Sequence, residues 1–361
     1  MSQQRKADDT RQKSVALVLG SGGARGYAHI GVIEEIEARG YRVVAISGCS
    51  MGAVIGGVYA AGELAAYRDW VCQLDYVDVL KLVDVTWSPM GAMKADKVMD
   101  KLEDLIGETR IEDLTIPVTT VATDLIRQRE VWFQKGSLLE AIRASIAVPG
   151  VITPVHRGEQ VLVDGGLLNP LPIIPTVSAQ ADFVLAVNVT AHSPRPVTLE
   201  ELLPPEEVAR EQARETSRDA RGVDFASWID GVRGAARRLL DGFGNHDDAE
   251  RGDKSEVEEA LEGGRREWGR MDMVLASFDI TQAALASYKV AGYLPDVLIE
   301  VPKTVCGAYE FHRAKALISL GRHLAVEALD RFERGGNPGG GGPSIPAEAS
   351  GKKGQEDEEA S

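Results

Sequence analysis

Short continuous apolar runs alternate with stretches of helical spacing along most of the chain. The first run, residues 15–19, ends in glycines, and residues 27–39 then carry apolar side chains at near-helical spacing before Gly40. A continuous apolar run is typical of a strand buried on both faces, and glycine commonly ends a helix. The pattern therefore predicts a strand, a glycine turn and a helix, the opening of a βαβ unit.

The same alternation recurs further along the chain. Apolar runs predict more strands, with helical stretches between most of them, at residues 43–46, 118–122, 161–163, 183–189 and 297–301. Strands that alternate with helices are typical of a mainly parallel sheet covered by helices. We therefore predict an α/β fold in three layers, with the sheet between helices.

Composition divides the chain into a main domain and less regular segments. Residues 193–270 are densely charged and carry little strand signal, which predicts a helical insertion within a domain of residues 15–334. Residues 1–14 are polar, and residues 335–361 have the glycine, proline and charge content of a disordered segment. We expect both ends to be disordered and to carry no chemistry.

One part of the insertion, residues 223–243, has apolar side chains at three- and four-residue steps beside several arginines. This spacing predicts an amphipathic helix that could lie on a membrane surface or cover a hydrophobic site. Alternatively, its apolar face packs on the domain itself or on a second copy of the chain in a homodimer. The sequence leaves these alternatives open.

Charge and cysteine content exclude several classes of partner. The 361-residue chain has a formal net charge of -15, whereas nucleic-acid binding needs clustered Lys and Arg. Its three cysteines match no zinc or disulfide spacing, which fits a reducing compartment. No apolar stretch approaches the roughly 20 residues of a membrane span, and the first run is too short for a signal peptide. These features predict a cytoplasmic protein, free or peripheral to the membrane.

A serine between two glycines is the first candidate for chemistry. Ser50 lies between Gly48 and Gly52 at a predicted strand-to-helix junction, the pattern of a G-x-S-x-G nucleophile turn. The N-terminus of the following helix would favour negative charge developing at the serine oxygen. The alternative is a glycine-rich turn whose serine only caps a helix.

A second glycine loop follows the first predicted strand and contains Gly20, Gly22, Gly23, Arg25 and Gly26. A dinucleotide or phosphate cradle is disfavoured, because arginine stands at the sixth position of G-x-G-x-x-G and no P-loop lysine follows. Alternatively, the N–H groups of Gly22 and Gly23 form an oxyanion hole, with Arg25 bracing the loop or adding positive potential. Because loops after neighbouring parallel strands share one crevice, the oxyanion interpretation fits better.

A carboxylate is a better candidate for the base than any histidine. The apolar run 161–163 ends in Asp164, Gly165 and Gly166, which predicts that Asp164 lies at the same sheet edge as Ser50. An Asx-type turn on the Asp-Gly pair is the alternative. The histidines are predicted to be structural or solvent-facing, with two of them in loops (His156, His192); the others are His29, His246, His312 and His323.

Together the three motifs resemble those of the patatin-like phospholipases. GSGGARG resembles the family's oxyanion loop, GCSMG its nucleophile turn, and DGG its catalytic aspartate motif. The similarity extends over most of residues 15–188 and resumes around 295–322, and it is greater to bacterial members related to neuropathy target esterase than to plant storage patatins. Ser21 stands where these relatives often carry glycine.

The resemblance implies a Ser-Asp dyad without histidine, in which Ser50 attacks an ester carbonyl and Asp164 takes its proton and later activates water. It implies a phospholipase A, lysophospholipase or esterase acting on lipid or other acyl esters, with no metal or cofactor. An acyltransferase with the same dyad is one alternative, and a catalytically inactive lipid-binding protein is another. A nucleotide-binding oxidoreductase is disfavoured by the glycine spacing.

Overall fold

The computed structural model describes residues 12–82, 94–210, 213 and 270–335. The chain divides into two compact units, one of Met1–Pro204 with Ala276–Ser361 and one of Pro205–Leu275. The amphipathic helix predicted at 223–243 and most of the predicted insertion lie outside the described residues, as do most residues of the two predicted disordered ends. In the described part of the chain, no helix is both long and apolar enough to span a membrane.

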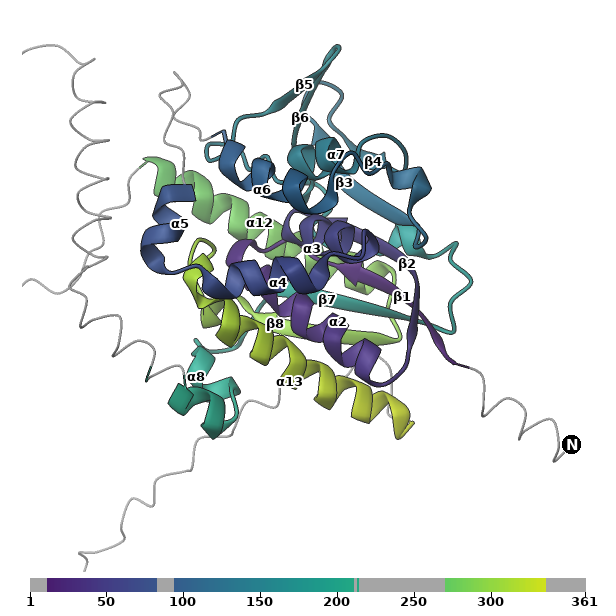
Figure 1. Ribbon diagram of the computed structural model, residues 1–361, viewed down its shortest axis with the longest axis vertical. Helices are drawn as coiled ribbons and strands as arrows, with labels where there is room; N and C mark the ends of the chain where they lie inside the picture. The colour runs from purple at the N-terminus through teal and green to yellow at the C-terminus, as the bar shows by residue number, and fades with distance from the viewer. Residues whose placement is uncertain (1–11, 83–93, 211–212, 214–269, 336–361) are drawn as a thin grey trace, which may run out of the picture. The chain divides into compact units, whose positions relative to one another are not determined.

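The first unit is built on an eight-stranded sheet, in the order β5-β6-β3-β2-β1-β7-β8, with β4 paired to β3 (Figure 1). Its central strands are parallel, as predicted, whereas β4 and β6 run antiparallel to β3 and β5 runs antiparallel to β6. The strands are β1 (Ser14–Leu19), β2 (Arg42–Cys49), β3 (Val118–Asp124), β4 (Arg129–Phe133), β5 (Val155–Arg157), β6 (Gln160–Asp164), β7 (Phe183–Ala191) and β8 (Val297–Pro302).

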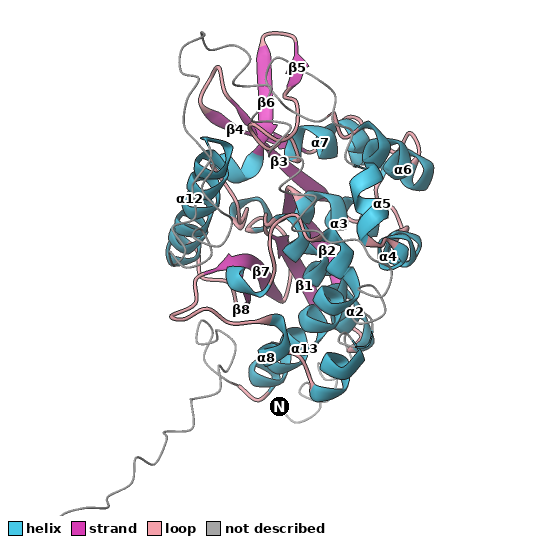
Figure 2. Cartoon of the chain, turned by 90° about the vertical axis from the view of Figure 1, so that its left-hand side faces the viewer, coloured by secondary structure: helices cyan, strands magenta, loops and turns pink. Residues whose placement is uncertain are grey.

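Helices cover both faces of this sheet, which confirms the predicted three-layer α/β class. Figure 2 shows α12 on one side of the sheet and α2, α3, α4 and α7 on the other. The helices of the described residues are α2 (Ala28–Ala38), α3 (Met51–Ala60), α4 (Leu64–Gln73), α5 (Tyr76–Leu82), α6 (Asp96–Ile106), α7 (Leu138–Ser145), α8 (Leu199–Leu202), α12 (Arg270–Gly292) and α13 (Ala314–Glu333).

Strand β1 lies at the centre of the sheet and is buried along its whole length. It pairs in parallel with β2 on one side and β7 on the other, so neither edge reaches solvent. Leu19 lies against the helix α3 at Gly56, while Val18 packs with Ala286 of α12 on the opposite face. Burial on both faces explains why the strand reads as a continuous apolar run rather than an alternating one.

Helices α2 and α13 cross in close contact through two glycines. A Cβ on Gly31 of α2 would lie 2.0 Å from the Ile318 carbonyl oxygen, and a Cβ on Gly321 of α13 would lie 2.0 Å from that of Ala28. Any side chain at either position would therefore force the helices apart. The crossing fixes the C-terminal helix against the helix that follows the first glycine loop.

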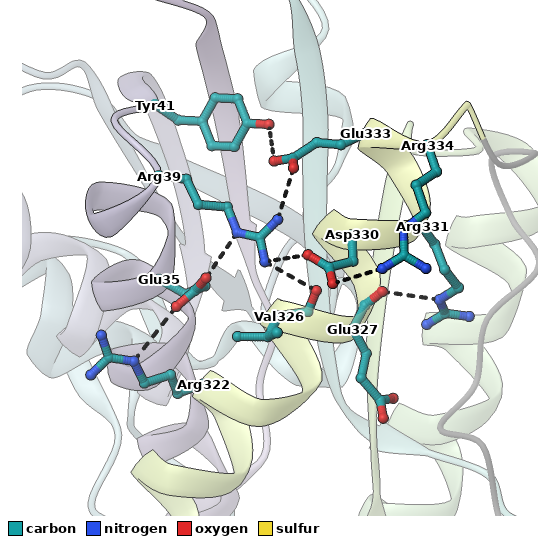
Figure 3. A network of polar contacts seen from close by, with 10 residues as sticks. All are labelled: Glu35, Arg39, Tyr41, Arg322, Val326, Glu327, Asp330, Arg331, Glu333 and Arg334. Carbon is teal, nitrogen blue, oxygen red and sulfur yellow. Dashed lines mark hydrogen bonds and ion pairs between the residues drawn. The ribbon is translucent and has the colours of Figure 1, made fainter.

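A polar network then fastens the end of α2 to the end of α13 (Figure 3). The Arg39 guanidinium contacts Glu35 at 2.8 Å, Asp330 at 2.7 Å and Glu333 at 3.0 Å, and the Tyr41 hydroxyl donates to Glu333 at 2.6 Å. The Arg39 side chain is only 16% exposed, so these contacts are partly shielded from water. The C-terminal helix is thereby joined to the N-terminal βα unit by both packing and charge.

Candidate active site

Ser50 lies at the apex of the turn between β2 and α3, as the sequence predicts. Its backbone has φ 53° and ψ -121°, a conformation that is strained for any residue other than glycine. A Cβ on Gly52 would lie 2.0 Å from the Leu19 carbonyl oxygen, and one on Gly48 would lie 2.4 Å from that of Gly52. Glycines are therefore required on both sides, and the serine is held at the helix N-terminus.

A buried serine that the sequence analysis did not identify as a site residue holds this turn in place. The Ser145 hydroxyl, at the end of α7, accepts a hydrogen bond from the Ser50 N–H at 2.9 Å and donates one to the Val121 carbonyl at 2.6 Å. It thus ties the turn to β3. Its contact with Ser50 was not predicted, because the two residues are 95 positions apart in the sequence.

Asp164 reaches the same sheet edge as Ser50, but by a different route from a parallel strand. Strand β6 runs antiparallel to β3, so its end would ordinarily lie at the opposite edge. However, β3 continues past the level of Cys49, which pairs with Val121, and β6 pairs only with this extension. Asp164 pairs with Ala122, the residue after Val121, so it lies one position along β3 from the level of Cys49. The predicted location is correct, whereas the implied strand direction is not.

The Asp164 carboxylate is fully buried, and this burial raises its pKa to about 6. The Ser50 hydroxyl, the Gly166 N–H and the Cys49 thiol each oppose this rise in pKa by favouring the charged form. Oxygen Oδ1 accepts from the Gly166 N–H at 2.7 Å, forming an Asx-type turn, and lies 3.8 Å from the Cys49 sulfur. A carboxyl with this pKa can accept a proton at neutral pH.

The second carboxylate oxygen, Oδ2, has no partner of regular hydrogen-bond geometry among the described residues. The Ser50 hydroxyl is therefore close enough to stabilise the carboxylate but is not aligned with it in an ordinary hydrogen bond. Catalytic pairs without substrate are often loosely aligned and tighten only when the reacting complex forms. The free oxygen is the position at which the carboxylate can accept a proton.

The first glycine loop packs directly against the serine turn. A Cβ on Gly26 would lie 2.4 Å from the Met51 Cβ, and one on Gly52 would lie 2.9 Å from the Gly20 carbonyl oxygen. The Ala24 N–H donates to the Ala308 carbonyl at 2.8 Å. The N–H groups of Gly22 and Gly23, the two residues before it, donate to no other group in the described part of the chain. Two free donors therefore lie in the loop next to the serine.

Arg25 is a brace for this loop. Its guanidinium donates to the Gly22 carbonyl at 3.1 Å, to the Lys303 carbonyl at 2.9 Å and to Asp279 at 2.8 Å, and the residue is 3% exposed. The sequence suggested two roles for Arg25, to brace the loop or to add positive potential. These contacts favour the bracing role. Arg25 holds the loop through the groups that surround it.

The histidines do not provide a base in the described part of the chain, where none hydrogen-bonds to Ser50 or Asp164. His29 lies in α2, and its Nε2 is 2.8 Å from the Gly20 carbonyl, so it supports the glycine loop. Burial lowers the pKa of His29 to about 4, which keeps the ring neutral. His156 lies in β5 rather than in a loop. No group of three His, Cys, Asp or Glu side chains within the described residues could hold a metal ion.

Comparison with known proteins gives several matches. Residues 17–177 match the family model described as patatin-like phospholipase. Uncharacterized NTE family proteins of Mycobacterium bovis and Mycobacterium tuberculosis are each 42% identical over 331 residues, covering 88% of this chain and 92% of theirs. Patatin-like phospholipase domain-containing protein 6 of Mus musculus is 32% identical over 183 residues, covering 49% of this chain and 13% of that protein. VipD from Legionella pneumophila, a solved structure, aligns over 89% of this chain and 67% of its own at 12% identity, with a TM-score of 0.41.

Proposed function

The chain belongs to the patatin-like phospholipase family, and from this premise we propose that it is a serine acyl-ester hydrolase that acts on lipids through Ser50 and Asp164. Membership supports lipid hydrolase activity in general. The observation that supports the specific dyad is the fully buried Asp164, with its pKa raised to about 6, beside a serine in a strained turn. A carboxylate in water, with a pKa near 4, would be a far weaker base.

The proposed reaction has two halves. In the first, the Ser50 oxygen attacks the ester carbonyl, its proton passes to Asp164, and the oxyanion is stabilised by the N–H groups of Gly22 and Gly23 and the N-terminus of α3. The alcohol then leaves with the proton from Asp164, and an acyl ester remains on Ser50. In the second, Asp164 takes a proton from water as the water oxygen attacks this ester. The bond between the acyl group and the Ser50 oxygen then breaks, Asp164 returns the proton to Ser50, and the fatty acid is released.

Phospholipids, lysophospholipids and simpler fatty acyl esters are the proposed substrates. All three have an ester carbonyl at the end of an apolar chain, and this carbonyl is the group that Ser50 would attack. They differ in the alcohol that leaves. Hydrolysis of each should be measured with the full chain in detergent micelles of fixed composition. The ratio of kcat/KM among them would identify the preferred leaving group.

Labelling with a fluorophosphonate tests the nucleophile directly. We expect the wild-type chain to be labelled, the Ser50→Ala variant to lose labelling and ester hydrolysis, and Asp164→Asn to lose most of both. Ser287→Ala, which alters an exposed serine on α12, is the matched control and should retain full labelling. Equal labelling of the wild type and Ser50→Ala would contradict the proposal.

A further inference from the structure

Gln282 of α12 contacts both loops of the proposed site, although it lies more than 100 residues beyond the family match. It is 4% exposed. Its Oε1 accepts a hydrogen bond from the Ser21 hydroxyl at 3.2 Å, and Ser21 precedes the two free N–H donors of the glycine loop. Its Nε2 would lie 2.3 Å from a Cβ placed on Gly166. One amide group therefore contacts both the glycine loop and the aspartate loop.

The two contacts lie next to the atoms that the proposed reaction uses. The Gly166 N–H holds Oδ1 of Asp164 at 2.7 Å, so the amide of Gln282 packs on the residue that orients the base. A Cβ on Gly166 would also lie 2.9 Å from the Ser21 hydroxyl oxygen. Ser21, Gln282 and Gly166 thus form one packed cluster. A change in the packing of this cluster would move the N–H groups of Gly22 and Gly23 relative to the Asp164 carboxylate.

The same face of α12 makes several other contacts within the first unit. Asp279, three residues earlier, binds Arg25 at 2.8 Å, and Lys289, seven residues later, binds Glu130 at 3.0 Å. Ala286, between them, is buried in the apolar cluster behind the sheet. Residues at spacings of three, four and seven lie on one face of a helix. These contacts fix the position of α12, and with it that of Gln282, beside both loops.

We infer that Gln282 is a positioning residue, which together with Ser21 fixes the distance between the oxyanion loop and Asp164. The inference rests on the proposed function. It also gives a role to Ser21, which the sequence analysis noted as a departure from the glycine of related proteins: its hydroxyl is the group that joins the loop to α12. Catalysis depends steeply on such placement, and a shift of about 1 Å can lower a rate about 100-fold.

Three variants test this role: Ser21→Gly, Gln282→Ala and the double variant. Because the Ser21 contact is a single hydrogen bond, we expect kcat for a p-nitrophenyl fatty ester to fall about 10-fold in each single variant, with KM little changed. The double variant should be no slower than the slower single variant, since both remove the same constraint. Thr281→Ala, on the exposed face of the same helix, is the control and should keep wild-type kcat.

Two further measurements separate positioning from general stability. The thermal midpoint of Ser21→Gly should match that of the wild type, and the rate of fluorophosphonate labelling should fall in parallel with kcat. Wild-type kcat in both single variants would overturn the inference, as would additive losses that follow the thermal midpoint. A wild-type chain that is not labelled at Ser50 would overturn the proposed function itself, which is a distinct result.

Discussion

Replacing Asp164 with asparagine should stabilise the folded chain at alkaline pH while it abolishes activity. Burial raises the pKa of Asp164 from 3.8 to about 6, so the folded state binds this proton more tightly than the unfolded state does. The stabilisation that comes from binding this proton is therefore fully present below the pKa of the unfolded state, and it is lost as pH rises through about 6. A shift of about two pKa units corresponds to a loss of roughly 3 kcal/mol at pH 8.

Asparagine removes the charge and keeps an oxygen that can accept from the Gly166 N–H. Denaturant unfolding at pH 8 should therefore show Asp164→Asn to be more stable than the wild type by up to roughly 3 kcal/mol. At pH 5 the gain should fall to about half, because the wild-type carboxyl is then largely protonated in the folded state. Asp104→Asn removes an exposed carboxylate and serves as the control, for which we expect little change at either pH.

A gain that does not depend on pH, or an asparagine variant less stable than the wild type at pH 8, would refute this reasoning. The first result would mean that the substitution acts through packing. The second would mean that the polar contacts of the carboxylate outweigh the cost of its burial. If the prediction holds, the site is one where stability has been lost in favour of activity.

Three further predictions follow from the same structure. The kcat/KM of the wild type should fall about 10-fold per pH unit below pH 6 as Asp164 is protonated, and a flat profile between pH 5 and 8 would contradict its proposed role as base. Gly52→Ala should lose folded, labelled protein because its Cβ would lie 2.0 Å from a carbonyl oxygen, whereas Gly292→Ala, with open space around it, should behave as the wild type in thermal melts. Arg39→Ala should lower the free energy of unfolding by roughly 2 kcal/mol, and an unchanged urea midpoint would show that its network contributes little.

Local patterns predicted the parts of the fold whose shape depends on neighbouring residues. The turn at Ser50 was predictable because a side chain at either flanking position would clash, which requires glycine there. Strand β1 was predictable because burial on both faces requires a continuous apolar run. The strands β4 and β5 were not predicted, since Arg129–Phe133 and Val155–Arg157 mix charged with apolar residues at the margin of the sheet. The antiparallel pairing of β6 with β3 was not predicted either. The residue pattern of a five-residue strand does not show whether it pairs in parallel or antiparallel.

The supporting residues of the site could not be predicted for a different reason. Ser145 contacts a residue 95 positions away, and Gln282 contacts one 261 positions away. Neither contact follows from a motif, because a lone serine or glutamine in a helix has many uses. The sequence therefore indicated the residues proposed to react, while their placement became visible only when distant segments were brought together.

The bond between Ala24 and Ala308 has a consequence for the protein during its synthesis. Ser50 and Asp164 are both synthesised long before the segment that holds the first glycine loop, which also includes the Lys303 carbonyl bound by Arg25. Fragments that end earlier, through stalled translation or proteolysis, would carry the reactive side chains in an unbraced setting. Such fragments would lack both backbone contacts that hold the first glycine loop, those to Lys303 and Ala308.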